Sequence, residues 1–233
     1  FNGILGIGVF VSDCGDYCAN DNTNQVYFKC AGASCNATTV AHDNQVQNPI
    51  AHFAGDPDNG NRADNNGVAV VIPSVPAGGA PSRTGYLVFG ISTRSNNVPS
   101  TSSQNYPVDA TFGEFKTQFG DNTYNSFIDT GSNALGIPPT RSLPDCSATD
   151  GNYAGWLCPS STQSFSAQNS GTGGYPTGTV NFKVGNFISL FGSGNGVFSE
   201  TAYASSKNIA GLFDWGWPFY FGKTLIQQFK NSS

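Results

Sequence analysis

The chain has 233 residues, of which 38% are hydrophobic and only 11% are charged, and its formal net charge is -5. Lys and Arg total 10 against 15 Asp and Glu, without a basic cluster, so the sequence lacks the electrostatic signature of a protein that binds nucleic acid or an anionic membrane. The longest apolar stretch, residues 4–11, is far shorter than the roughly 20 residues that cross a bilayer. The sequence therefore predicts no nucleic-acid partner and no membrane span.

The sequence contains no Met and starts at Phe1, within an apolar segment. Because translation starts at Met, we expect the chain to be a processed piece of a longer protein. A signal peptide is not visible, so the compartment is inferred from the cysteines and the composition.

Six cysteines in a chain rich in Asn, Ser, Thr and Gly indicate an oxidising compartment, which means a secreted, periplasmic or cell-surface protein. Four of them lie close together in the sequence and two form a separate pair: Cys14, Cys18, Cys30 and Cys35, then Cys146 and Cys158. We expect two disulfides in the first group, with three connectivities open, and one between the last two. The alternative for the first group is a zinc site, although its spacings are wider than those of a Cys-x2-Cys knuckle.

Short runs rich in Val, Ile, Phe and Tyr alternate with clusters of Gly, Asn, Ser and Pro, which predicts an all-β fold with long loops. Phe115, Thr117 and Phe119 alternate with polar residues at the period of a half-buried strand, and Asp121-Asn122 follows as a turn. The expected strands are residues 68–72, 85–91, 108–115, 127–129, 179–184 and 219–229. The expected loops are residues 56–67 and 160–178.

Two groups of side chains suggest chemistry only weakly. The first loop carries three carboxylates that could bind calcium: Asp56, Asp58 and Asp64. An EF-hand needs Asp or Asn at its fifth position and Gly at its sixth, but these positions hold Gly60 and Asn61, so we interpret the segment as a solvated loop. His42 and His52 have no nucleophile motif nearby and are interpreted as surface histidines.

Residues 125–135 carry the most informative motif, because an apolar strand leads a carboxylate, Asp129, directly into a tight turn. Gly131 lets the backbone approach the carboxylate closely, and the hydroxyls of Thr130 and Ser132 can bond to it. Hydrolysis by a carboxylate dyad uses such a turn: two Asp share one proton, because like charges at close range cannot both ionise, and a water between them attacks a peptide carbonyl. The same four residues also form an ordinary β-turn.

With its flanking segments, the chain resembles the pepsin-like aspartic peptidase superfamily. Residues 1–8, Phe-Asn-Gly-Ile-Leu-Gly-Ile-Gly, are similar to the segment that closes the first lobe, and residues 85–90 to the strand just before the second lobe. Residues 106–132 resemble the strand, hairpin and Asp-Thr-Gly order of that second lobe. Residues 212–223 lie where the family has a hydrophobic-Gly turn and a strand, and this ending is most similar to uncharacterised bacterial secreted pepsin-like proteins.

The resemblance implies that the chain is the second half of a bilobal protein. Residues 1–84 would be the end of the first lobe with a Cys-rich inter-lobe segment, and residues 85–233 the second pepsin-like lobe. A first-lobe polypeptide, such as the cleaved N-terminal half, would supply the second catalytic Asp and the flap Tyr. The sequence departs from the family where Asp214-Trp215-Gly216 replaces the usual two aliphatic residues before Gly.

Carried over to this sequence, the resemblance gives the Asp129 turn its roles. Asp129 would be one catalytic carboxylate and Gly131 its turn residue. Thr130 would lock the two lobes together, and Ser132 would bond to the outer carboxylate oxygen. The implied mechanism needs no metal and no cofactor.

The resemblance implies the C-terminal chain of a secreted aspartic endopeptidase, acting on a peptide or protein substrate and active only with a first-lobe partner. The alternative is a non-catalytic pepsin-like binding or structural protein outside the cell, which the low charge and the Cys-rich start suit equally well. A third hypothesis is a homodimer that pairs two copies of Asp129.

Overall fold

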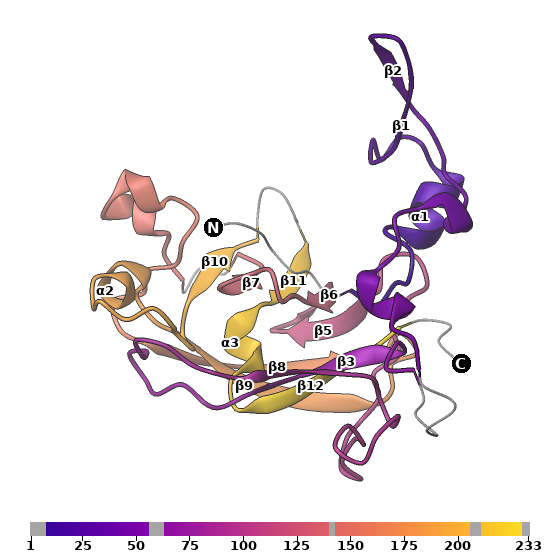
Figure 1. Ribbon diagram of the computed structural model, residues 1–233. Coiled ribbons are helices and arrows are strands. Elements are labelled where there is room, and N and C mark those ends of the chain that lie inside the picture. Colours follow the sequence, from indigo (N-terminus) through magenta and orange to yellow (C-terminus); the bar gives the residue numbers. More distant parts are fainter. Residues whose placement is uncertain (1–7, 56–62, 140–142, 206–210, 230–233) are drawn as a thin grey trace.

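The structure is a computed structural model that describes residues 8–55, 63–139, 143–205 and 211–229. It is predominantly β, as the sequence predicts, with three sheets and a few short helices (Figure 1). The strands are β1 (Phe28–Ala31), β2 (Ser34–Ala37), β3 (Gly67–Ile72), β4 (Tyr86–Phe89), β5 (Phe115–Phe119), β6 (Asn122–Ile128), β7 (Leu135–Ile137), β8 (Gln163–Ser170), β9 (Thr177–Val184), β10 (Ala202–Ala204), β11 (Leu212–Trp215) and β12 (Lys223–Gln228). The helices are α1 (Gly15–Asn20), α2 (Phe187–Phe191) and α3 (Trp217–Tyr220), with single 3-10 turns η1 (His42–Asn44), η2 (Pro49–His52), η4 (Cys146–Ala148) and η5 (Gly151–Tyr153).

The largest sheet has seven strands in the order β10-β7-β11-β6-β5-β8-β9. Strands β6, β5, β8 and β9 pair antiparallel, whereas β11 runs parallel to β6 and β10 parallel to β7. Strand β11 therefore lies between β6 and β7, which are consecutive in the sequence. The connection at residues 129–134 has to cross the end of β11, and this crossing creates the candidate site.

The alternation predicted on β5 is confirmed, because Phe115, Thr117 and Phe119 are all buried. The strand expected at residues 108–115 is wrong, since residues 110–112 form a turn and β5 begins only at Phe115. The carboxylate of Asp109 explains the difference: it accepts hydrogen bonds from the backbone N–H groups of Thr111, Phe112 and Glu114, which a strand ladder would otherwise use.

The loop expected at residues 160–178 is also wrong, because it contains β8 and the start of β9. In β8, Ser164, Ser166 and Gln168 face solvent, while Ala167 and Asn169 are buried and Phe165 is half-buried. Inside the sheet, Thr117 donates to the Asn169 side chain at 2.7 Å, and the Trp215 indole donates to Thr117 at 3.1 Å. Strand β8 is thus polar in composition but has the inward side chains of a strand.

The segment expected as one strand at residues 219–229 is divided in two. Pro218 lies in the first turn of α3, which suits its fixed φ, and Gly222 turns the chain at φ 76° into β12. Strand β12 pairs with β3, and β3 pairs with β4, in a three-stranded antiparallel sheet. The domain boundary predicted between residues 84 and 85 falls just before β4 and stays a prediction.

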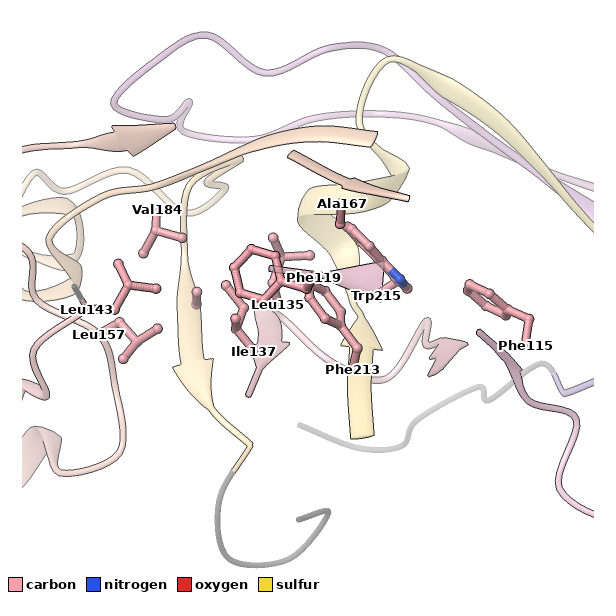
Figure 2. Close-up of a cluster of buried hydrophobic side chains, with 11 residues drawn as sticks. Phe115, Phe119, Leu135, Ile137, Leu143, Leu157, Ala167, Val184, Phe213 and Trp215 are labelled. Atoms are coloured by element: carbon pink, nitrogen blue, oxygen red, sulfur yellow. The ribbon is translucent and has the colours of Figure 1, made fainter. Parts of the chain in front are cut away.

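One aromatic cluster fills the core of the seven-stranded sheet (Figure 2). Phe213 and Trp215 of β11 stack with ring centroids 4.3 Å apart, and both side chains are fully buried. Tyr220 is fully buried as well, so the aromatic residues after position 212 belong mainly to the core. Residues 1–7, most of the segment that the resemblance relates to the end of the first lobe, lie outside the described residues.

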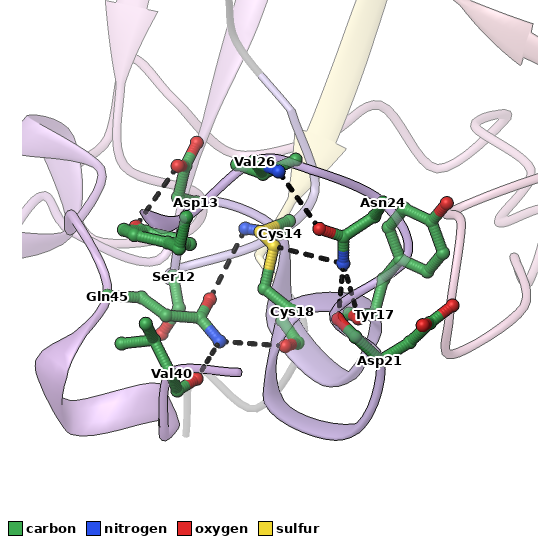
Figure 3. The surroundings of a disulfide bond; sticks show 12 residues. Ser12, Asp13, Cys14, Tyr17, Cys18, Asp21, Asn24, Val26, Val40 and Gln45 are labelled. Atoms are coloured by element: carbon green, nitrogen blue, oxygen red, sulfur yellow. Dashed lines mark hydrogen bonds between the residues drawn. A yellow bond between two sulfur atoms is a disulfide. The ribbon is translucent and has the colours of Figure 1, made fainter. Parts of the chain in front are cut away.

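All six cysteines form disulfides, which pair Cys14 with Cys18, Cys30 with Cys35, and Cys146 with Cys158. The last pair is the expected one, and the first two select one of the three open connectivities. No thiolate is left for the zinc alternative. Around the first disulfide, the buried Gln45 side chain accepts from the Cys14 N–H and donates to the carbonyls of Gly15 and Val40 (Figure 3). The second disulfide closes the β1–β2 hairpin, which projects from the body of the protein (Figure 1).

The weaker candidates have ordinary structural surroundings where the structure describes them. Asp64 is paired with Arg94, whose Nε lies 2.6 Å from a carboxylate oxygen, and it also accepts from Thr93, while Asp56 and Asp58 lie outside the described residues. Both histidines are exposed, as expected. Within the described ranges, no helix is long and apolar enough to cross a membrane.

Replacing Phe213 by Ala should lower the free energy of unfolding by about 3 to 5 kcal/mol, because it leaves a cavity in the centre of the aromatic cluster. The matched control is Phe28→Ala on the projecting hairpin, where the residue is 51% exposed and the change should stay within about 0.5 kcal/mol. Urea denaturation of both variants measures the difference. Equal losses in the two variants would contradict the assigned core.

Candidate functional site

Asp129 follows directly after β6, and its backbone N–H donates to the Trp215 carbonyl of the neighbouring β11 at 3.2 Å. The next residues hold its carboxylate on both sides. The Gly131 N–H donates to one oxygen at 2.6 Å, and the Ser132 hydroxyl donates to the other at 2.7 Å. The side chain is half-buried. The turn thus presents a fixed carboxylate that remains accessible.

This turn rests against the chain that follows β11. The Trp217 N–H donates to the Ser132 carbonyl at 2.9 Å. Gly216 lies so close to the turn that a Cβ there would be 2.7 Å from the Ser132 carbonyl oxygen and would also collide with that of Ala134. A glycine is therefore required at this contact, which fixes residues 129–134 over the end of β11.

Asp214, in the middle of β11, is a second carboxyl beside this turn. It pairs with Phe127 of β6 and with Gly136 of β7, and only 1% of its surface is exposed. One carboxyl oxygen accepts a hydrogen bond from the Tyr203 hydroxyl of β10 at 2.7 Å. The other oxygen, Oδ1, has no hydrogen-bond partner within the described part of the chain.

Gly136 makes room for this buried pair. A Cβ at this position would lie 2.6 Å from the Tyr203 hydroxyl and 2.8 Å from Cβ of Asp214. Neither contact is possible without a shift of the side chains or of β7. The sequence of β7 thus provides space for the hydrogen bond between Tyr203 and Asp214.

Burial raises the pKa of Asp214 to about 6, because the charged form loses its hydration. The hydrogen bond from Tyr203 and the nearby Ser132 hydroxyl oppose this shift, while the nearby charge of Asp129 adds to it. Burial also raises the pKa of the Tyr203 and Tyr220 hydroxyls, and in both cases the two carboxylates contribute to the rise. The two carboxyls and the two phenols therefore form one electrostatic unit, and the Ser132 hydroxyl, which bonds to Asp129, also affects Asp214.

The four residues proposed from the motif, Asp129, Thr130, Gly131 and Ser132, lie in one turn, and Thr130 is half-buried there. Sequence reasoning missed Asp214, Tyr203 and Tyr220. A signal for Asp214 existed, since a carboxylate between Phe213 and Trp215 is unusual in a buried strand. No local signal pointed to Tyr203, because only the sheet brings it to Asp214.

The described residues contain no group of three or more His, Cys, Asp or Glu side chains arranged to hold a metal ion. The polar groups of the site are two carboxyls and the hydroxyls of Ser132, Tyr203 and Tyr220. Such a set is suited to moving and holding protons.

Comparison with known sequences gives the family. The model of a family described as "Protein of unknown function (DUF3443)" matches residues 1–233, so the chain belongs to that family. A search of curated proteins gave no match. The geometry around Asp129 is therefore the main guide to function.

The pKa of Asp214 predicts a pH-dependent stability. Its folded-state pKa of about 6 exceeds the ordinary value of 3.8, so the folded protein holds the proton more tightly than the unfolded chain. This contribution is present below about pH 4 and is lost as the pH rises through about 6, by roughly 3 kcal/mol in total. We expect Asp214→Asn to remove this decrease in the free energy of unfolding with rising pH. Urea denaturation at pH 4 and pH 6.5 measures it in both proteins.

The exposed carboxylate Asp121, in the β5–β6 turn, provides the control for that experiment. Asp121→Asn should keep the pH dependence of the wild type. Parallel profiles for the wild type and Asp214→Asn would show that Asp214 does not titrate differently in the folded state.

Gly136→Ala should lower the free energy of unfolding by about 1 to 3 kcal/mol, because the added methyl group overlaps the Tyr203 hydroxyl and Asp214. Gly173→Ala is the matched control, since a Cβ there meets no atom within 4 Å. Thermal and urea denaturation of both variants test this. If the two variants are equally stable, the packing described for β7 is wrong.

Proposed function

We propose that this chain is the second lobe of a secreted pepsin-like aspartic endopeptidase, in which Asp129 is one of the two catalytic carboxylates. The observation that carries the proposal is the geometry at Asp129. A half-buried carboxylate stands at a strand end, and the turn that follows holds both of its oxygens. A catalytic carboxylate must be fixed in this way and still be reachable by water and substrate.

The proposed reaction is general acid–base hydrolysis of a peptide bond. Asp129 and an Asp from a first-lobe polypeptide would share one proton and hold a water between them. The ionised carboxylate takes a proton from the water as the water oxygen attacks the peptide carbonyl, and the protonated one gives its proton to the carbonyl oxygen. Collapse of this intermediate transfers a proton to the leaving amine. No metal, cofactor or covalent intermediate is needed.

The arrangement of the chain supports this proposal beyond the four-residue motif. The resemblance relates residues 127–132 to the Asp-Thr-Gly strand and residues 212–223 to the hydrophobic-Gly turn. These segments are far apart in the sequence but adjacent in the fold, joined by the parallel pairing of β6 and β11 and by the contact of Gly216 with the Ser132 turn. Thr130, beside Asp129, would contact the partner lobe.

The proposed location is outside the cytoplasm, in the extracellular space, the periplasm or at the cell surface. Three disulfides support it, because such bonds persist in oxidising compartments. The partners would be a first-lobe polypeptide and a peptide or protein substrate. With a net charge of -5, the chain is not suited to binding nucleic acid.

The β1–β2 hairpin favours a second candidate function, a non-catalytic binding or structural protein of the pepsin-like type. All four residues of β1 are exposed, including Phe28, and Val26 next to the strand is 47% exposed. The Cys30–Cys35 disulfide makes the hairpin rigid, as suits a binding element. In that case the Asp129 turn would be a structural remnant of the fold.

Peptidase activity tests the first proposal. Protein isolated with its native partner chain should hydrolyse peptides at acidic pH, and pepstatin should inhibit it. Asp129→Asn should lower kcat/KM at least about 100-fold, because the amide can neither accept nor hold the proton. Mass spectrometry of the same preparation should detect a second polypeptide with its own Asp-Thr-Gly or Asp-Ser-Gly.

The control for this assay is again Asp121→Asn, which removes one exposed carboxylate from the turn at the opposite end of β6 and should keep full activity. Hydrolysis that survives Asp129→Asn would exclude the catalytic role. A preparation that contains the second chain but cleaves no peptide at any acidic pH would favour the binding protein.

A further inference from the structure

The carboxyl of Asp214 is buried under conditions that disfavour its charge. Only 1% of the residue is exposed, and Oδ1 has no partner within the described chain. An ionised carboxylate that is buried without a cation or a full set of donors is costly. The titratable groups that affect the pKa of Asp214 are Asp129 and Tyr203, Asp214 in turn affects Tyr220, and no Lys, Arg or His of the described residues is among these groups. These surroundings favour the neutral acid.

We propose that Asp214 is a second carboxyl of the Asp129 site, a positioning residue that holds a proton in the interior and acts on Asp129 through the Ser132 turn, which is hydrogen-bonded to the residues on either side of Gly216. Its effect on catalysis rests on the proposed function, whereas the linkage between the two carboxyls does not. Nothing in the Asp-Thr-Gly resemblance assigns this residue, since the family has aliphatic side chains at this position.

The hydrogen bonds define where the proton of Asp214 lies. The Tyr203 hydroxyl donates to Oδ2, and burial together with the Asp214 carboxyl keeps this phenol protonated, so Tyr203 does not accept the acid proton. The proton of neutral Asp214 therefore belongs on Oδ1, the oxygen that receives no hydrogen bond. A protonated oxygen at this place avoids a bare anionic atom in the interior.

Ser132 transmits the state of Asp214 to Asp129. Its hydroxyl has one proton, which is donated to Oδ2 of Asp129 at 2.7 Å. Neutral Asp214 does not compete for this proton. Ionised Asp214 would attract it, because Ser132 also interacts with the Asp214 carboxyl, and would repel the charge on Asp129 as well. A proton on Asp214 thus leaves the hydrogen bond from Ser132 to Asp129 intact.

Burial also distinguishes this role from that of a catalytic partner. Water and substrate can reach the half-buried Asp129, but they cannot reach Asp214. The second carboxyl of a water-holding dyad would still have to come from another polypeptide. Asp214 can act only through Ser132 and through its charge.

Carbon-13 NMR of the full chain labelled at its Asp carboxyl carbons tests the linkage directly. The wild type should show one Asp carboxyl that titrates near pH 6, and Asp214→Asn should remove this titration. In Asp129→Asn the midpoint of Asp214 should fall by roughly half a unit to one unit, because a repelling charge is gone. In Ser132→Ala it should rise, since the Ser132 hydroxyl lowers the pKa of Asp214.

Asp121→Asn controls for the loss of a carboxylate as such and should leave the midpoint unchanged. The proposal is overturned if the titration near pH 6 persists in Asp214→Asn, or if Asp129→Asn does not move it. Circular dichroism spectra matching the wild type exclude misfolding as the cause of a lost signal. If Asp214→Asn does not fold, the shift of the Asp214 midpoint in Asp129→Asn alone tests the proposal. Asp129 is half-exposed, so its replacement leaves the core intact.

The peptidase assay distinguishes this proposal from the proposed function. If peptides are hydrolysed, Asp214→Asn should remove the fall in kcat that accompanies ionisation near pH 6, a change that a merely structural role would not produce. If the two carboxyl titrations are linked but the protein has no peptidase activity, the carboxyl pair is supported and the peptidase is rejected. If the protein cleaves peptides but the two carboxyls titrate independently, the peptidase is supported and the carboxyl pair is rejected.

Discussion

The insertion of β11 between β6 and β7 is the constraint on which the rest of the structure depends. Two strands that are consecutive in the sequence cannot pair when a third lies between them, so the chain after β6 must turn sharply over the end of β11. That turn contains Asp129, and the centre of β11 contains Asp214. The same topology places the aromatic residues of β11 in the core and its one carboxyl beside the site.

The sequence predicts the structure correctly where that structure depends on residues that are close together along the chain. The alternation around Phe115 predicted β5, and the apolar run before Asp129 predicted a strand that ends in a turn. Hydrogen bonds from Gly131 and Ser132 to Asp129 are contacts over two and three residues, which a motif can encode. The Cys146–Cys158 disulfide, with a separation of 12 residues, is similarly local.

The errors arose where distant contacts override local composition. The polar segment at residues 160–178 has the composition of a loop, but β5 and β9 provide partners for its backbone, and Asn169 is stabilised by Thr117. Asp109 shows the opposite case, since its carboxylate accepts hydrogen bonds from backbone N–H groups in a segment whose composition predicts a strand. Tyr203 and Asp214 meet only through the order of β10, β7 and β11, which no pattern in the sequence specifies.

The space at Gly136 limits how sequences of this fold can diverge. Gly136, Tyr203 and Asp214 occupy one volume, so a change in one alters what the other two positions tolerate. A relative with an aliphatic residue in place of Asp214 has no need for the phenol hydroxyl, and with a smaller residue in place of Tyr203 it can accept a side chain at Gly136. These three positions should therefore vary together, although they lie on three strands and are up to 78 residues apart in the sequence.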